Sequence, residues 1–328
     1  MERGLVPIGG YFELELPHRC SLPHSSPYSY YYQSARAAFR ALLRAVEPAR
    51  VWLPAYICES MISSVVDHGT TLAFYKQSDL LAIEAFEPSP DDMIVVVNYF
   101  GLHDHAIDQL LKRLNKHQVV VDNSQAFFSK PFDCLGTLYS PRKFMGVPDG
   151  GILHTRYELT PEVLTEQSDV DSLSRCLYLT KRLGLGAEAG YADYQAAEST
   201  LACTQPQSMS QLTRKILSSV DIDTIAALRR RNYLFFSENI RAFNKKHIPL
   251  LNDAVPLCYP FTTDNKALRS ELITEKVFLA TYWPDVRSRV SADSVELGFV
   301  EQMLPIPIDQ RNSLESLERI VNFLHKFF

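Results

Sequence analysis

Short apolar runs alternate with stretches of helical spacing between residues 50 and 155. Each run is about strand length and is almost continuously apolar, which is typical of strands buried on both faces. Strands of this kind separated by helices predict an α/β fold with a mostly parallel sheet flanked by helices. The runs are Val51–Tyr56, Thr70–Lys76, Met93–Asn98, Gln118–Asp122 and Ile152–His154.

The clearest helical pattern begins near Ser34. Apolar residues recur there at helical spacing up to Val46, and Ser34 is a suitable N-cap. Residues 220–246 predict a long helix that leads into a smaller C-terminal α/β unit. That unit is expected to contain a strand near Pro256–Phe261 and helices near Lys266–Glu275 and Ser313–Phe327.

These patterns predict three parts. Residues 1–30, rich in Pro, His, Ser and Tyr, are expected to form an extended N-terminal arm. Residues 31–220 would form the large domain and residues 221–328 the small C-terminal domain. A chain of 328 residues is long enough for this division.

Composition excludes several classes of protein. Hydrophobic residues make up 46% and charged residues 22%, which is ordinary for a globular protein. The net charge of −5 and the lack of a basic stripe disfavour a nucleic-acid partner. No apolar run approaches the roughly 18 residues of a membrane span, and no secretory signal pattern is seen at the start. Six scattered cysteines without a CxxC pair favour a cytoplasmic protein without a metal site.

Two segments carry candidate chemistry at strand ends. Asp122 ends an apolar run, so it is either a ligand-binding carboxylate in the crevice of the sheet or a cap of the following turn. Ser140 precedes Lys143 by three positions, before the turn at Gly150–Gly151. Apolar neighbours would partly dehydrate Lys143 and leave its neutral amine available for imine formation, while Ser140 could bind phosphate. A surface lysine on a loop is the alternative.

The start of the first helix is a third candidate. Free N–H groups of Ala35 and Arg36, with the hydroxyl of Ser34 and the charge of Arg36, could bind a phosphate. A solvated, capped helix is the alternative. A phosphate-binding helix start, a strand-end aspartate and a lysine together match the needs of pyridoxal 5′-phosphate (PLP): the lysine holds the aldehyde and the aspartate keeps the pyridine nitrogen protonated.

Most of the chain resembles the DegT/DnrJ/StrS family of PLP-dependent sugar aminotransferases. The segments that carry the resemblance are Ser34–Phe39, Val51–Tyr56, Asn98–Gly101, Asp122–Ala126, Tyr139–Gly151 and Leu304–Ile308. The family implies the aspartate-aminotransferase fold (fold type I), a cytoplasmic homodimer, and an amino-acid donor such as glutamate. It also implies a keto sugar nucleotide as the acceptor.

The resemblance assigns roles to individual residues. Lys143 would carry the cofactor and move the substrate proton. Asp122 would pair with the pyridine nitrogen, and Gln125 would bond the phenolic oxygen or the ring edge. Ser34, Ala35, Arg36 and Ser140 would hold the phosphate. Cys58 stands where the family has a ring-stacking aromatic residue, which leaves Tyr56 or Tyr99 for that role.

Two alternatives remain. The chain could be a catalytically silent relative that binds a sugar nucleotide or a partner, because the segment Gly190–Tyr194 lacks the asparagine that the family lends to the neighbouring subunit. It could also use PLP for sugar dehydration, although such members replace the lysine that is present here as Lys143.

Overall fold

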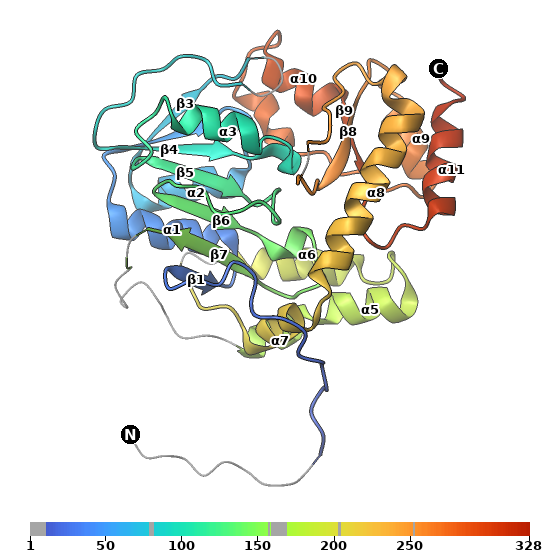
Figure 1. Cartoon of the computed structure of the whole chain (residues 1–328), viewed down its shortest axis with the longest axis horizontal. Coiled ribbons are helices and arrows are strands. Elements are labelled where there is room, and N and C mark those ends of the chain that lie inside the picture. Colours follow the sequence, from blue (N-terminus) through green and yellow to red (C-terminus); the bar gives the residue numbers. More distant parts are fainter. Residues whose placement is uncertain (1–10, 79–81, 157, 159–168, 203–204, 252) are drawn as a thin grey trace.

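The computed structural model describes residues 11–78, 82–156, 158, 169–202, 205–251 and 253–328. Its main sheet has seven strands in the order β1-β7-β6-β5-β4-β2-β3 (Figure 1). The predicted α/β class and the mostly parallel sheet are confirmed, and each predicted strand lies within two residues of an observed one. The strand before the lysine segment, β6, was not predicted. The bounds are β1 Ser29–Tyr32, β2 Arg50–Pro54, β3 Thr71–Tyr75, β4 Asp92–Val97, β5 Val119–Asn123, β6 Gly136–Tyr139 and β7 Gly151–Thr155.

The directions of the strands bring their ends together. Strands β2 to β6 pair in parallel, β7 runs antiparallel to β6, and β1 runs antiparallel to β7. Strand β1 therefore points the same way as β2 to β6. All six carboxyl ends, together with the start of β7, lie at one edge of the sheet.

Both faces of the sheet are covered, as the continuous apolar runs predict. In the central strands β4 and β5 every residue is buried. Val95 and Val120 pack into the same cluster as helix α1, whereas Val96 and Val121 pack on the other face with Ile107 of α3. Because side chains alternate along a strand, Asp122 continues the face of Val120, which is the α1 side. The helices concerned are α1 Ala35–Val46, α2 Glu59–His68 and α3 Asp104–Leu111.

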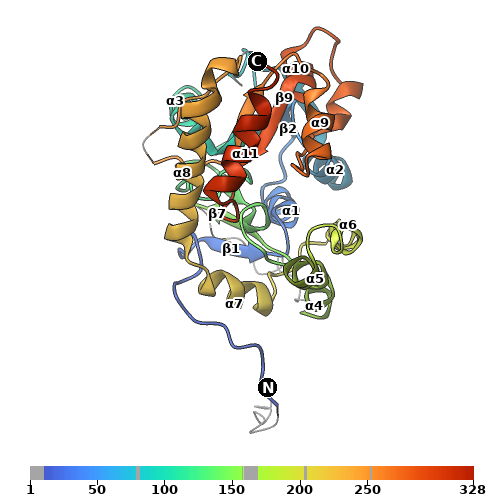
Figure 2. The same ribbon diagram turned by 90° about the vertical axis from the view of Figure 1, so that its right-hand side faces the viewer.

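The C-terminal elements form a smaller group beside the sheet. Figures 1 and 2 show the long helix α8 running along this group, beside a two-stranded sheet and shorter helices. Strands β8 and β9 are antiparallel, and their core is continuous with that of the main sheet. The predicted strand and helices are confirmed here; the division at residue 221 stays a prediction. The bounds are α8 Ile222–Ile240, β8 Cys258–Thr262, α9 Leu268–Thr274, α10 Val295–Gln302, β9 Met303–Pro307 and α11 Leu314–Leu324.

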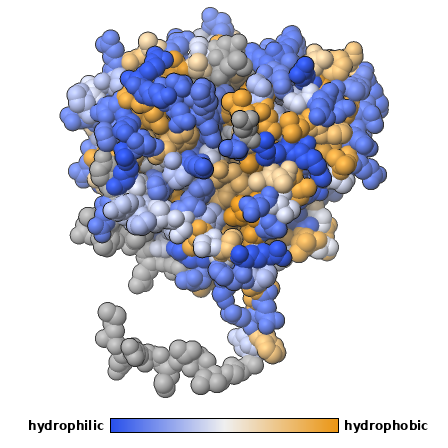
Figure 3. All heavy atoms as spheres, viewed as in Figure 1, coloured by the Kyte–Doolittle hydropathy of each residue, from blue (hydrophilic) through white to orange (hydrophobic). Residues whose placement is uncertain are grey.

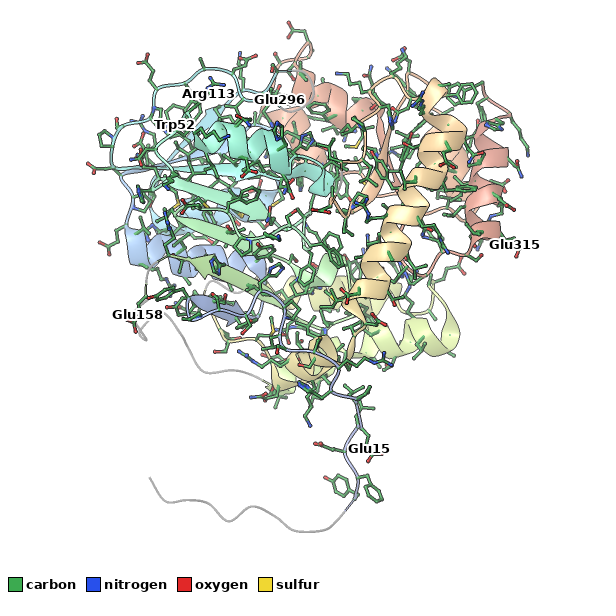
Figure 4. The ribbon with its side chains drawn as sticks, in the orientation of Figure 1. Glu15, Trp52, Arg113, Glu158, Glu296 and Glu315 are labelled. Carbon is green, nitrogen blue, oxygen red and sulfur yellow. The ribbon has the colours of Figure 1, made fainter. Side chains whose placement is uncertain are left out.

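The two groups meet through specific contacts. The carboxylate of Glu296 on α10 (Figure 4) is buried and accepts a hydrogen bond of 2.8 Å from the amide of Gln77, just after β3. Arg289 donates to the carbonyl oxygens of Ala55, at 3.0 Å, and Ile57 after β2. A band of apolar surface lies between the sheet and the C-terminal elements (Figure 3). The loops at the carboxyl ends of β2 and β3 are therefore tied to the C-terminal group.

Four helices between the two groups were not predicted. They lie after β7 and pass along one side of the sheet before α8 (Figure 1). None of the helices in the described ranges is long and apolar enough to cross a membrane. These four helices are α4 Asp169–Arg175, α5 Leu177–Leu185, α6 Tyr191–Thr200 and α7 Gln211–Ser219.

The N-terminal arm is only partly extended. Its last two residues, Ser29 and Tyr30, are half-buried in the edge strand β1, and the wholly buried Tyr32 follows the predicted arm. The bounds of the arm stay a prediction. Before β1, His24 stacks on Tyr139 with ring centroids 3.8 Å apart and donates from Nε2 to the carbonyl oxygen of Phe127 at 2.6 Å. Burial lowers the pKa of His24 to about 4.

The burial of His24 predicts that the stability of the protein depends on pH. The unfolded chain binds a proton at His24 below its ordinary pKa of 6.5, whereas the folded chain does so only near 4. The free energy of unfolding should therefore fall as pH drops from 6.5 to 4, by about 2 to 3 kcal/mol from this group. Chemical denaturation at pH 7 and pH 4.5 checks this: His24→Gln should lose less stability than the wild-type protein between the two. Equal losses would contradict it.

Candidate functional site

Five chain segments meet at the carboxyl edge of the sheet. They follow β1, β2, β4, β5 and β6, and they contain every residue that the sequence singled out. Polar side chains at this edge can face a common ligand, since open α/β sheets bind ligands in the crevice outside the strand ends. The segments are Gln33–Arg36, Ala55–Cys58, Asn98–Gly101, Asp122–Gln125 and Ser140–Lys143.

The start of α1 is held against the turn that begins β7. Ser34 is the N-cap, as predicted, and its hydroxyl accepts from the amide of Ala37 at 3.1 Å. The amide of Gly150 donates to the carbonyl oxygen of Gln33 at 2.7 Å. A Cβ added at Gly151 would lie 2.0 Å from the carbonyl carbon of Ser34, so only glycine allows this approach. Because the first N–H groups of a helix have no partner within it, the site gains an anion-binding end.

Two arginines flank this helix start. Arg36 donates to the carbonyl oxygen of Leu201 at 3.3 Å, and Arg142 pairs with Glu198 of α6. In each, the Nε atom is buried and has no hydrogen-bond partner among the described residues. Burial disfavours the charge of Arg142, but Glu198 outweighs it and raises the pKa of the guanidinium. Sequence reasoning missed Arg142; its position beside Lys143 was the available signal.

Asp122 does two things at the end of β5. Its Oδ1 accepts from the amide of Ser124 at 2.8 Å, which is the turn-capping role that the sequence left open. The side chain is 6% exposed, and the Oδ2 atom forms no hydrogen bond with the described residues. One carboxylate oxygen is thus fixed by the turn, and the other is left for a ligand.

Gln125 is oriented by one end of its amide. Its Oε1 accepts from the amide of Phe100 at 3.0 Å, and its Nε2 is buried with no partner in the part of the chain that the structure describes. A buried unpaired donor is costly, so Nε2 indicates a missing acceptor. Behind this turn, Asn98 donates to Asn123 at 3.0 Å and to Asp104 at 2.5 Å, which fixes the neighbouring ends of β4 and β5.

Lys143 ends the short 3₁₀ turn Pro141–Lys143 that follows β6. Its side chain is exposed and forms no hydrogen bond or ion pair with the described residues. The expected dehydration by Phe144 and Met145 is not seen in this structure: those two side chains are buried, whereas Lys143 is exposed. Ser140 is 8% exposed, and its carbonyl oxygen accepts from the Lys143 amide at 3.3 Å.

Tyr56, in the segment after β2, is the remaining candidate from the sequence. Its ring is wholly buried and contacts Tyr99, at a centroid distance of 5.6 Å, and Trp283, at 4.5 Å. Burial raises the pKa of its phenol. The hydroxyl of Tyr99 donates to the carbonyl oxygen of Tyr56 at 2.5 Å. Tyr56 packs between the sheet and the C-terminal group, and its hydroxyl is buried without a hydrogen-bond partner among the described residues. Its cofactor-binding role stays a prediction.

Known structures share this architecture. CalS13, a sugar aminotransferase from Micromonospora echinospora, matches with a TM-score of 0.61 and 16% identity over 92% of this chain and 88% of its own. A DegT DnrJ EryC1 StrS aminotransferase from Brucella abortus matches with a TM-score of 0.61 and 15% identity, over 91% of this chain and 85% of its own. Spr1654 of Streptococcus pneumoniae, solved in a PLP form, matches with a TM-score of 0.63 and 14% identity, over 91% of this chain and 86% of its own. The chain has the fold of these aminotransferases. No family model matches the sequence, and no curated protein resembles it.

The side chains at the edge fit PLP. The unpaired Nε2 of Gln125 can meet a phenolate oxygen, and Asp122 offers an oxygen to a ring N–H. The helix start, with the unpaired Nε atoms of Arg36 and Arg142, suits a phosphate. An unpaired lysine completes the set. By contrast, the described part of the chain contains no group of three or more His, Cys, Asp or Glu side chains suited to a metal ion.

The close approach at Gly151 predicts a sharp effect of Gly151→Ala. A methyl group 2.0 Å from the Ser34 backbone must push the start of α1 away from β7. We expect a loss of about 2 to 4 kcal/mol in unfolding free energy, and weaker binding of phosphate-bearing ligands. Denaturant unfolding measures the first effect and ligand titration the second. The control is Gly184→Ala, since an added Cβ there meets nothing within 4 Å; similar behaviour of both variants would contradict the prediction.

Proposed function

We propose that this protein is a PLP-dependent aminotransferase that moves an amino group from an amino acid to a keto sugar carried on a nucleotide. The observation that carries the proposal is the unpaired amine of Lys143 at the same sheet edge as Asp122 and the anion-binding start of α1. The fold shared with sugar aminotransferases supports the reaction class. It gives less support to the sugar nucleotide, which rests on the family resemblance.

Each residue would have one task. Bound PLP would supply an aldehyde and an electron-withdrawing ring. The amine of Lys143 would hold the aldehyde end and, once free, carry the proton that leaves Cα of the amino donor. The carboxylate of Asp122 would keep the ring nitrogen protonated, and Nε2 of Gln125 would donate to the phenolic oxygen. Ser34, Ala35, Arg36, Ser140 and Arg142 would neutralise and orient the phosphate.

The presence of Lys143 favours amino transfer over dehydration. A reaction that returns a proton to carbon needs a mobile base at the site, and Lys143 is the candidate. The side chain is exposed and has no competing carboxylate among the described residues. It is thus free to move between the cofactor and the substrate.

A test of the proposal is where PLP attaches. After addition of PLP, we expect visible absorbance, and borohydride reduction followed by peptide mapping should place the cofactor on Lys143. Lys143→Ala should abolish this absorbance and reduce turnover by on the order of a thousandfold or more. Lys130→Ala, which changes another lysine of the large domain, is the control. Labelling elsewhere, or none, would show a silent relative.

We further propose that the protein acts in the cytoplasm as a homodimer. Helix α5 has no buried side chain, and Leu183 and Leu185 are 89% and 73% exposed. Tyr191 on α6 adds a ring that is 60% exposed. Such clustered apolar exposure is typical of a surface covered by another chain. Glu198 of α6 pairs with Arg142, so a dimer built on α5 and α6 would be connected to the proposed phosphate-binding groups through this ion pair. The five described cysteines are all free, as in a reducing compartment.

The dimer is tested by changing α5. Leu183→Asp, combined with Leu185→Asp, should convert the dimer into a monomer in light scattering, because a carboxylate cannot be buried unpaired in the contact. Leu314→Asp is the matched control, since that leucine is also exposed (47%) but lies on α11. The dimer proposal fails if the wild-type protein is monomeric, or if the double variant keeps the dimer mass.

A further inference from the structure

Arg229 is the largest fully buried side chain of the described chain. It lies on α8 at 2% exposure and forms no ion pair with the described residues. Its Nη1 donates to the carbonyl oxygens of Pro256, at 3.3 Å, and Leu257, at 3.1 Å, while its Nε is buried and meets no acceptor from the described ranges. Burial lowers the pKa of the guanidinium to about 10. The charge of Asp309 offsets only part of the effect of burial on this cation. A buried cation that forms no ion pair is costly, so simple filling of space does not account for it.

The ring of Phe144 lies against this cation. The guanidinium carbon of Arg229 is 4.7 Å from the ring centroid, within the range of a cation–π contact. Phe144 is 2% exposed, and it is the residue directly after Lys143. The rings of Phe127 and Phe128 close its other sides, with centroids 5.8 Å and 5.6 Å away.

A second contact from the C-terminal group reaches the same residue. The Nε2 of Gln310, just after β9, donates to the carbonyl oxygen of Phe144 at 2.9 Å. The amide of Leu257, whose carbonyl oxygen binds Arg229, donates to the carbonyl oxygen of Phe100 at 2.8 Å, beside Gln125. The C-terminal group thus contacts Phe144 through both its ring and its backbone, and it also contacts Phe100 in the segment after β4.

We propose that Arg229 and Gln310 are positioning residues that hold Phe144 and thereby fix the place of Lys143 at the sheet edge. Lys143 itself is exposed and unpaired, so nothing on its own side chain determines where the amine lies. The buried Phe144 next to it sets the position of the Lys143 backbone, and thereby where the amine lies. The reactive amine stays mobile at its tip, while its backbone is held from behind by the C-terminal group.

Because the role given to Lys143 rests on the proposed function, the test has a part that needs no cofactor. Limited trypsin digestion of the protein without PLP, followed by mass spectrometry, reports cleavage after Arg142 and Lys143. Cleavage requires local opening of the turn, so the cleavage rate measures how firmly Arg229 and Gln310 hold the turn through Phe144. We expect Arg229→Met and Gln310→Ala each to raise cleavage at these two bonds about tenfold, with other sites unchanged.

The second part uses PLP. In both variants the cofactor should bind about tenfold more weakly, because the lysine is held less well in place. The pH at which the visible absorbance of bound PLP changes should rise in Arg229→Met, which removes a nearby cation, and return toward the wild-type value in Arg229→Lys. A purely structural role of Arg229 would not move this pH.

The outcomes separate the two proposals. Arg231→Met, an exposed arginine on the same helix, is the control and should behave as the wild-type protein. If the wild-type protein does not bind PLP, the proposed function fails, and digestion alone tests whether Arg229 and Gln310 hold the turn in place. If Arg229→Met does not fold, Gln310→Ala decides. Cleavage at the turn that stays at the wild-type level, or that rises equally along the whole chain, would overturn the inference.

Discussion

The close contact between the Gly150–Gly151 turn and the start of α1 is the constraint on which the site depends. It joins the first strand to the last strand of the same sheet, two parts of the chain more than a hundred residues apart in sequence. Without a side chain at residue 151, the Ser34 backbone can lie against β7, and the helix end then opens at the sheet edge beside the lysine turn. Any larger residue would separate the anion-binding helix from Lys143. The same pair of glycines therefore serves both the stability and the chemistry of the fold.

Charge at this edge is arranged asymmetrically. Arg36, Arg142 and Lys143 supply cations around the helix start, whereas Asp122 lies on the strand beyond β6. A ligand that carries a phosphate at one end and a basic ring nitrogen at the other would match this order, since each end then meets the opposite charge. Glu198 belongs to the arrangement as well, because it holds Arg142 in place without reaching the edge itself.

Much of the sheet could be predicted because its strands are buried on both faces, so their runs of valine and isoleucine are unmistakable in the sequence. Strand β6 was missed because Gly136–Tyr139 is short, contains a glycine and a threonine, and takes its place only through pairing with β5 and β7. The helices α4 to α6 were missed for a related reason: they bury few side chains, so little apolar periodicity marks them.

The site residues also divide into those with a local sequence signal and those whose position depends on distant packing. Ser34 and Asp122 were found because a cap and a strand end have local sequence signals. The exposure of Lys143 and the core position of Tyr56 depend on packing against distant residues, which no local pattern reports. Dehydration of Lys143 was inferred from its neighbours in sequence, yet successive residues of a turn point in different directions.

The junction between the sheet and the C-terminal group follows from these packing effects. Tyr56, Tyr99 and Trp283 fill it with rings, and the Tyr99 hydroxyl donates to the Tyr56 carbonyl oxygen, which joins the loops after β2 and β4. Arg289 binds the first of these loops from the C-terminal side, as Arg229 binds the lysine turn. A shift of the C-terminal group would therefore move two of the five edge segments together. Because such packed contacts switch between discrete arrangements rather than deform continuously, the C-terminal group is placed to set the geometry of the edge as a unit.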